Sequence, residues 1–249
     1  MRIDSDVVSE GRRLLALAEA EDVPLRLLGG VAIRLRAAGE HPAAFSRSYA
    51  DLDFATTRKA SGRVSELFRR EGYTPQTAFN ALHGGERLLF FDDEHDRQVD
   101  VFVGSFAMCQ KIPLEERLGV DAVSIPLAEL LLTKLQVIEL NEKDIRDTLA
   151  LLHDHPVGDA DGETLNGARV AALCAADWGL WRTITQNLGV CRAFAESYEI
   201  PDPPRVYGRI DELLDRIDRE PKSRAWKLRA KIGDRKRWYQ LPEEVAGGP

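Results

Sequence analysis

The chain has 249 residues, of which 44% are hydrophobic and 30% are charged. This length suits one large domain or two modest ones, and the composition excludes collagen-like, mucin-like and wholly disordered proteins. Because 34 basic residues are outnumbered by 41 acidic ones, the net charge is −7, and any contact with nucleic acid has to use a local basic patch.

Cysteine usage and the N-terminus indicate a cellular compartment. The three cysteines are odd in number, far apart in the chain and without metal-ligand spacing: Cys109, Cys174 and Cys191. Such cysteines are typical of free buried thiols in a reducing compartment. The first 15 residues are charged, and no run of about 18 apolar residues occurs, so we expect no signal peptide, no membrane span and a cytoplasmic protein.

The first half of the sequence predicts both helices and strands. An apolar stripe at helical spacing predicts a helix over 5–20 that Ser5 caps. Short apolar or alternating runs predict strands, and Gly or polar clusters predict the turns between them. In chain order we expect a strand at 25–28 ended by Gly29 and Gly30, a helix at 31–38, a loop at 40–49, a strand at 51–54, a helix at 64–70, and a hairpin of strands at 87–91 and 98–103.

The second half predicts helices alone. From Pro126 onward the apolar spacing is helical, with Pro and Gly between the segments. The expected helices cover 127–140, 144–152, 167–174, 178–195, 206–217 and 224–232. The sequence therefore predicts an α+β protein, with a mixed sheet and flanking helices in residues 1–125 and an all-helical domain in residues 126–249.

Three aspartates in the first half are candidates for metal binding. Asp51 and Asp53 project to the same side if the chain there is a strand. Asp100 sits between two valines, and a charge in an apolar strand is costly unless it is paired or coordinated. Three carboxylates on one face can hold two Mg²⁺ ions, the arrangement that serves phosphoryl transfer. Each motif alone also has a simpler interpretation, as a solvated strand end or an edge residue.

Gly29 and Gly30 can serve the same chemistry. A strand that ends in glycines and leads into a helix presents free backbone N–H groups, and glycine lets the backbone approach a triphosphate closely. The simpler interpretation is a tight turn. The order of the motifs favours function, because the glycines precede the acidic pair and a third aspartate follows on a later strand.

These residues resemble the pattern of the nucleotidyltransferase superfamily, which has the fold of DNA polymerase beta and of the aminoglycoside nucleotidyltransferases. The matching segments are LLGGVAIRL, YADLDFA and QVDVFVG. The resemblance implies a nucleotidyltransferase-like core and a Mg²⁺-dependent transfer of a nucleoside monophosphate from a nucleoside triphosphate (NTP) to a hydroxyl. It also implies that Gly29 and Gly30 hold the triphosphate, that Asp51 and Asp53 bind metal, and that Asp100 completes a second metal site.

A further segment resembles the AbiEii-type nucleotidyltransferases, which include toxins of type IV toxin–antitoxin systems. This segment is LLLTKLQVIELNEKDIRDTLALL. The resemblance implies that Lys134 pairs with phosphate and that a cognate antitoxin is a partner. Asp144 and Asp147 would orient Lys134 or the nucleotide, or would hold the two domains together.

Two departures from the superfamily pattern lie near the predicted site. Gly30 stands where a serine is often found, and 20 residues separate it from Asp51, about twice the common spacing. Residues 40–49 are therefore an expected insertion beside the site. Within it, Arg47 and Ser48 either contact phosphate or belong to a solvated loop.

A basic segment at 219–239 interrupts the acidic chain. It contains nine Lys and Arg residues between 219 and 237 against Glu220 and Asp234, with Trp226, Trp238 and Tyr239 among them. Basic side chains neutralise phosphates and aromatic rings stack on unpaired bases, so this segment suits an RNA acceptor such as the end of a tRNA. The alternatives are a solvated basic helix face with tryptophans packed in a core, or pairing with the acidic first half.

Two other functions remain open at this point. One is a small-molecule nucleotidyltransferase with an aminoglycoside-like acceptor. The other is a non-catalytic nucleotide-binding interaction module, which keeps the fold without turnover.

Overall fold

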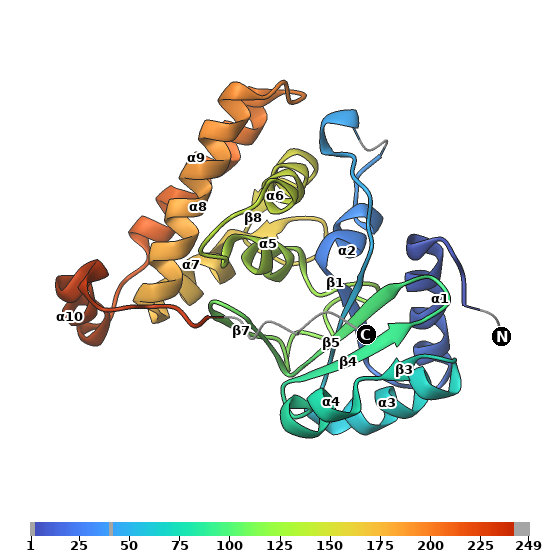
Figure 1. Cartoon of the computed structure of the whole chain (residues 1–249). Helices are drawn as coiled ribbons and strands as arrows, with labels where there is room; N and C mark the ends of the chain where they lie inside the picture. The colour runs from blue at the N-terminus through green and yellow to red at the C-terminus, as the bar shows by residue number, and fades with distance from the viewer. Residues whose placement is uncertain (1–2, 40–41, 242–249) are drawn as a thin grey trace.

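The computed structural model describes residues 3–39 and 42–241, which form an α+β protein built on a mixed five-stranded sheet (Figure 1). The strand order is β1-β2-β5-β4-β3, in which β2 and β5 pair in parallel and the other neighbours pair antiparallel. The strands are β1 (Leu25–Leu28), β2 (Leu52–Thr56), β3 (Thr74–Pro75), β4 (Arg87–Asp92) and β5 (Arg97–Val103). The predicted fold class and the hairpin of β4 and β5 are confirmed.

Helices α1 (Val7–Ala20) and α3 (Ser61–Arg70) cover one face of the sheet. The Phe68 ring on α3 stacks on Phe90 of β4 at 5.0 Å and meets Phe54 of β2 edge-on at 5.8 Å. Successive side chains of a strand point to opposite faces of the sheet. Because Phe54 points toward α3, Asp53 points to the opposite face. The packing of α3 thus decides toward which side the acidic residues point.

Helix α2 (Gly29–Leu35) leaves β1 and contacts both β1 and β2. Beyond it come α4 (Thr77–His83) and a small antiparallel pair, β6 (Ser105–Ala107) with β7 (Lys111–Pro113). Short 3-10 turns lie at Ala43–Phe45 and Arg58–Ala60, with a third at Gly233–Arg235 in the C-terminal part.

The C-terminal half is mostly helical and packs around α5. Its helices are α5 (Leu127–Leu135), α6 (Glu142–Asp154), α7 (Gly167–Ala176), α8 (Trp178–Ser197), α9 (Pro203–Arg219) and α10 (Arg224–Ile232). Helix α5 is buried over nearly its whole length, since it contacts α2, α6, α7 and α8. Helix α9 is amphipathic and buries Val206, Ile210, Leu213 and Ile217 at helical spacing. The division of the chain at residue 125 stays a prediction.

Several element predictions are corrected by the structure. Asp6 rather than Ser5 caps α1, because its carboxylate accepts from the Ser9 N–H at 2.8 Å. Helix α2 begins at Gly29, so the two glycines open the helix instead of separating it from the strand. The second half is not all-helical, because β8 (Val157–Gly158) and β9 (Leu165–Asn166) pair in parallel after α6. Part of the predicted loop at 40–49, residues 40–41, lies outside the described residues.

The three cysteines are free and buried, as predicted. Among the described helices, none combines the length and the hydropathy needed to cross a membrane.

Candidate functional site

Asp53 and Asp100 lie side by side on the face of the sheet opposite α3. They are Cα partners in the parallel pairing of β2 and β5, so their side chains leave the sheet on the same face. Asp53 is half-buried and Asp100 is 4% exposed. Asp51 is exposed and lies one residue before β2. The alternation of side chains along the strand therefore does not fix the direction of its side chain.

The three carboxylates influence one another electrostatically. Burial, followed by the negative charges of Asp100 and Asp51, raises the pKa of Asp53 to about 7, although Lys134 and Arg87 act in the opposite direction. Partial burial and the charge of Asp100 also raise the pKa of Asp51. The structure therefore brings the three predicted acidic residues into one electrostatic cluster.

Asp100 already has two partners in this arrangement. Its Oδ1 accepts a hydrogen bond from Arg87 Nε at 2.6 Å, and its Oδ2 accepts one from Gln98 Nε2 at 2.7 Å. The Arg87 guanidinium also lies 5.3 Å from the centre of the Phe102 ring. Within residues 3–39 and 42–241, no three His, Cys, Asp or Glu side chains are arranged as a preformed metal site. The sequence analysis did not identify Arg87, because its closeness to Asp100 depends on the register of the hairpin.

Gly29 and Gly30 place backbone against the acidic cluster. Gly29 has φ +70°, a conformation that side chains disfavour, and a Cβ there would lie 2.1 Å from Asp53 Oδ2. A Cβ at Gly30 would lie 1.9 Å from an Arg47 terminal nitrogen and 3.0 Å from Tyr49. Neither position admits a side chain without moving its neighbour. The glycines thus allow the start of α2 to sit directly beside Asp53 and Arg47.

Lys134 and Arg47 are both held by carboxylates of α6. Lys134 Nζ lies 3.0 Å from Asp144 and 2.9 Å from Asp147. Arg47 donates to both oxygens of Asp147, at 2.9 and 2.7 Å, in a bidentate pair. The side chains of Arg47 and Asp147 are 15% and 3% exposed. A solvated loop is therefore the wrong interpretation for Arg47, whereas Ser48 is exposed. The side chain of Lys134 is 13% exposed.

This network contributes to the electrostatics of the site. Burial raises the pKa of Asp147, but the hydrogen bond from Arg47 and the charges of Lys134 and Arg47 outweigh it, so the pKa is lowered. Burial lowers the pKa of Lys134, but the negative charges of Asp147 and Asp144 outweigh this effect, so the pKa is raised. Lys134 consequently keeps its positive charge beside the acidic cluster. The contacts of Asp144 and Asp147 with Lys134 match the expected orientation of that lysine, and the pair of Asp147 with Arg47 also matches the alternative that these residues join the two halves of the chain.

A cavity of about 740 Å³ opens beside the acidic cluster. Its lining contains Asp51 and Gln98 from the cluster side, and the end of β4 with the following turn supplies Asp92, Asp93 and Asp96. Arg97 is the basic residue in this lining, and it donates to the backbone carbonyls of Asp4 and Ser5 at 2.9 Å. The space next to Asp51 is thus strongly acidic.

The basic segment 219–239 is docked on α7 and α8 through its tryptophans. Trp226 donates to the Cys174 carbonyl at 3.0 Å, and Trp238 donates to the Thr183 hydroxyl at 3.0 Å. Their rings lie 5.1 Å from Trp181 and 5.9 Å from Trp178, respectively. Both indoles therefore pack within the protein, as the alternative interpretation of this segment expects, while basic residues such as Lys227 and Arg235 are exposed.

No protein-family model matches the chain, and no curated protein matches it. Among solved structures, the crystal structure of a lincosamide antibiotic adenylyltransferase, LnuA, bound to lincomycin is similar to this chain. The two share 17% sequence identity and a TM-score of 0.39, over 56% of this chain and 92% of that one. A likeness of this extent leaves the activity to be argued from the geometry of the site.

Proposed function

We propose that this chain is a Mg²⁺-dependent nucleotidyltransferase. It moves a nucleoside monophosphate from an NTP to a hydroxyl acceptor and releases pyrophosphate. The observation that carries this proposal is the register that sets Asp53 beside Asp100, with the Gly29 backbone packed against the Asp53 carboxylate. In the reaction, the acceptor oxygen forms a bond to the α-phosphorus, the bond from that phosphorus to the β-phosphate oxygen breaks, and the hydroxyl proton is lost.

The donor set fits a hard divalent cation. Asp51, Asp53 and Asp100 offer oxygen ligands alone, which suit Mg²⁺. Burial, followed by the charges of Asp100 and Asp51, raises the pKa of Asp53, and a bound cation would offset this effect. We assign Asp51 and Asp53 to one ion and Asp100 to a second. When bound, Mg²⁺ neutralises charge on the triphosphate and favours loss of the acceptor's proton. Without a cation, the ion pair with Arg87 neutralises part of the negative charge of Asp100.

Gly29, Gly30 and two cations would bind the triphosphate. The glycines let phosphate oxygens reach backbone N–H groups, since no side chain stands between them. Arg47 lies against Gly30, and Lys134 keeps its charge through Asp144 and Asp147. These groups position the α-phosphate, and positioning with charge neutralisation is the main catalytic contribution in such transfers.

The test is label transfer from α-labelled NTPs in the presence of Mg²⁺ and a cell lysate. We expect Asp53→Asn to abolish transfer. Asp218→Asn, which changes an exposed carboxylate on α9, is the matched control and should leave it unchanged. Full activity of Asp53→Asn would contradict the metal role. NTP binding by the wild type without release of pyrophosphate would instead select the non-catalytic interaction module.

The acidic cavity favours a second, narrower candidate function, with a small amine-bearing alcohol as the acceptor. Asp93 and Asp96 join Asp51 in its lining, and this charge attracts a cation and repels the phosphates of RNA. A volume of about 740 Å³ lies within the usual range for small-molecule sites. An amine-bearing sugar, with its hydroxyl directed toward Asp51, has the required chemistry.

RNA remains the other acceptor class, through the basic segment 219–239. The two classes are separated by paired variants in the same labelling assay. Asp93→Asn with Asp96→Asn should raise the KM for an amine-bearing sugar, whereas Lys227→Gln with Arg235→Gln should leave it unchanged. Label on RNA that is lost in the second pair and kept in the first would reject the small-molecule acceptor.

The resemblance to AbiEii-type toxins adds a proposal about the role in the cell. A toxin of this type acts with a cognate antitoxin. Expression of the wild type should then arrest growth, and expression of Asp53→Asn at the same level should not. Equal growth of both strains would reject the toxin role without affecting the label-transfer result.

A further inference from the structure

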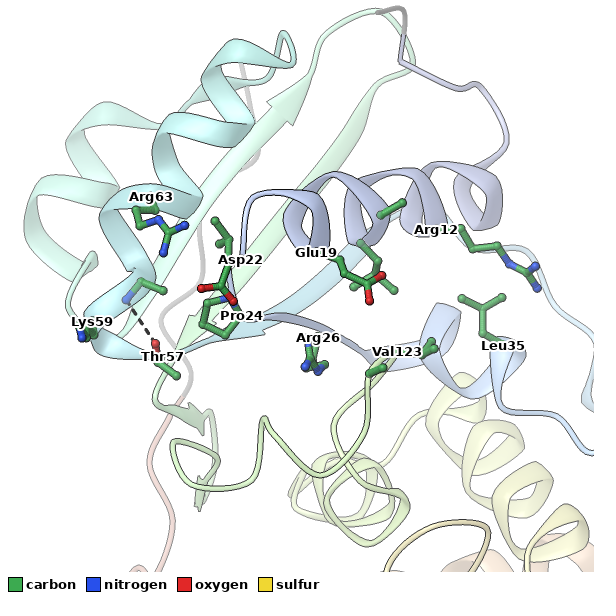
Figure 2. A pocket seen from close by; sticks show the side chains of 15 residues that line it. Arg12, Glu19, Asp22, Pro24, Arg26, Leu35, Thr57, Lys59, Arg63 and Val123 are labelled. Carbon is green, nitrogen blue, oxygen red and sulfur yellow. Dashed lines mark hydrogen bonds between the residues drawn. The ribbon is translucent and has the colours of Figure 1, made fainter.

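A separate groove lies at the other end of β1 from Gly29. The antiparallel register pairs Leu28 with Asp53 at the acidic end and Leu25 with Thr56 at the opposite end. At this opposite end, α1, the start of β1, the residues leading into α3 and the 122–123 segment enclose about 820 Å³ (Figure 2). The groove is therefore distinct from the acidic cluster and from the cavity beside Asp51.

Four cations line this groove: Arg12, Arg26, Lys59 and Arg63. No salt bridge within 4.0 Å joins any of them to Asp or Glu in the described part of the chain. Other arginines of this protein are paired, such as Arg13 with Glu10 and Glu71. The lining also contains Glu19 and Asp22, so its formal charge is +4 − 2 = +2, within a chain of net charge −7.

Arg26 occupies the middle of the groove. Its guanidinium donates to the Leu25 carbonyl at 2.7 Å and to the Asp121 carbonyl, both of which are neutral acceptors. Burial lowers the pKa of Arg26, although the negative charges of Asp121 and Glu19 act in the opposite direction. Figure 2 shows Arg26 between Pro24 and Val123. A half-buried guanidinium of this kind is stabilised when an anion binds to it.

Figure 2 also shows how the other cations are distributed. Lys59 and Arg63 lie at one end, near Thr57 and Asp22, and Arg12 lies at the other end, beside Leu35. Arg63 donates to the Glu21 carbonyl, again a neutral acceptor. Between the two ends, apolar residues such as Leu15, Pro24 and Val123 line the groove together with Arg26 and Glu19. The groove thus offers cationic groups near an apolar surface.

We propose that this groove is a second ligand site, which binds an organic phosphate of about the size of a nucleoside diphosphate. The phosphates would lie against Arg26, Lys59 and Arg63, and the organic part would lie on the apolar surface toward Leu15. Guanidinium groups bind phosphate oxygens in a bidentate geometry, which favours phosphate over a halide ion. The volume of the groove lies within the range of small-molecule sites.

Calorimetric titration of the full chain with ADP tests this proposal, in EDTA and at low ionic strength. EDTA removes divalent cations, which the proposed transfer site needs. Arg63→Gln and Arg26→Gln should each weaken ADP binding about tenfold or more. Arg69→Gln is the matched control, because Arg69 is on the same helix, is exposed and does not line the groove; it should change the affinity less than about twofold.

Inorganic pyrophosphate is the second probe. It should bind several-fold more weakly than ADP, because it cannot use the apolar surface. Lys59→Gln with Arg63→Gln removes charge at exposed positions and replaces Arg26→Gln if that variant unfolds. Three results would overturn the proposal: no ADP binding at millimolar concentration, equal losses in Arg63→Gln and Arg69→Gln, or a loss in Asp53→Asn but not in Arg63→Gln. Label transfer should be unchanged in Arg63→Gln, so this test is independent of the proposed function.

Discussion

Asp53 and Asp100 are direct partners across the parallel strands β2 and β5, with their carboxylates on the face opposite α3. Two neighbouring carboxylates in a partly buried place repel each other, and the raised pKa of Asp53 records that repulsion together with burial. Positive charge from Arg87 and Lys134 offsets part of it. Repulsion between these carboxylates therefore lowers the stability of the fold at the site where we propose that a cation binds.

Asp53→Asn should increase stability while it abolishes transfer. A carboxyl whose pKa in the folded protein is raised to about 7 destabilises the fold once it is ionised in the unfolded chain. This loss of unfolding free energy is absent below about pH 4, grows up to about pH 7 and is constant above about pH 7. We expect a gain of about 1–3 kcal/mol at pH 8 in EDTA, after allowance for solvent screening. Urea unfolding measures it, and a loss of stability at pH 8 would contradict this account.

Divalent cations should stabilise the wild type through the same residues. Binding to the folded state alone raises the melting temperature, and EDTA should reverse the rise. We expect Mg²⁺ with a non-hydrolysable NTP to raise the melting temperature of the wild type. Asp53→Asn and Asp100→Asn should show little or no rise. Differential scanning calorimetry makes the comparison, and an equal rise in all three proteins would place the cation elsewhere.

Asp147→Asn should destabilise the protein by about 2–4 kcal/mol at pH 7, because it leaves Arg47 and Lys134 partly buried with less counter-charge. The pKa of Asp147 is lowered in the folded protein, so its contribution is present above its unfolded pKa and is lost as the pH falls through the lower folded value. Asp159→Asn is the control, since Asp159 pairs with Arg216 but is 83% exposed. It should cost less than about 0.5 kcal/mol in the same chemical unfolding assay.

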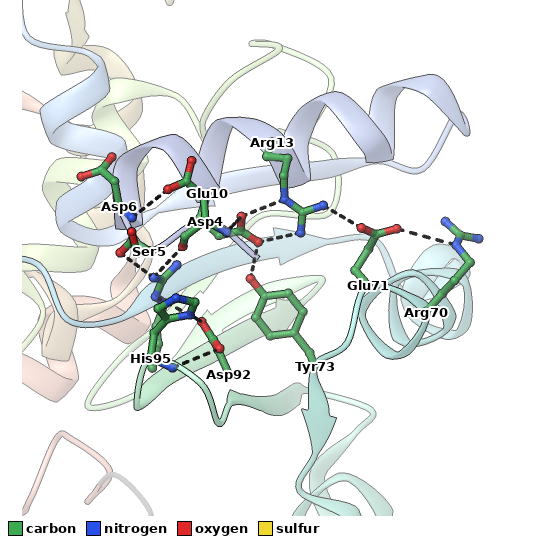
Figure 3. A network of polar contacts seen from close by, with 11 residues as sticks. Asp4, Ser5, Asp6, Glu10, Arg13, Arg70, Glu71, Tyr73, Asp92 and His95 are labelled. Carbon is green, nitrogen blue, oxygen red and sulfur yellow. Dashed lines mark hydrogen bonds and ion pairs between the residues drawn. The ribbon is translucent and has the colours of Figure 1, made fainter. Parts of the chain in front are cut away.

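A buried network around Glu10 fixes the N-terminal segment to the sheet (Figure 3). Glu10 accepts from Arg13 at 2.8 Å, from the Asp4 N–H at 3.0 Å and from the Tyr73 hydroxyl. Burial raises the pKa of Glu10, but these hydrogen bonds outweigh it and the pKa is lowered. The stabilisation is therefore present above the ordinary pKa of 4.5 and is lost as the pH falls through the folded value.

Tyr73→Phe tests this network with a small change. Loss of one hydroxyl donor should cost about 1 kcal/mol at pH 7, and the difference from the wild type should shrink in acid as Glu10 is protonated. Tyr207→Phe on α9 is the control, because Tyr207 packs through its ring against the core and Arg192, so loss of its hydroxyl should have little effect. Unfolding curves at neutral and acidic pH give the difference in unfolding free energy between Tyr73→Phe and the wild type at each pH. A difference that is the same at both pH values would reject the coupling to Glu10.

Local patterns in the sequence were sufficient for most of the secondary structure. The strand at 25–28, the hairpin at 87–103 and the helices of the second half follow from apolar spacing and from nearby turn residues. Helix α4 and strand β3 were missed, because neither buries any of its residues and so neither shows an apolar pattern. The start of α2 was misplaced, since glycines usually separate elements. Here Gly29 packs closely on Asp53 and Gly30 on Arg47, so both glycines are needed inside the first turn.

By itself, the sequence determined which residues are available for chemistry: a glycine pair, an acidic pair, a lone strand aspartate and a helical lysine followed by two aspartates. The contacts of Arg87 with Asp100 and of Arg47 with Asp147, a hundred residues away, became visible in the folded protein alone. The same holds for the acidic cavity beside Asp51 and for the cationic groove at the Leu25 end of β1. The physical reason is that these contacts depend on strand register and helix packing, which bring together charges that no local spacing relates.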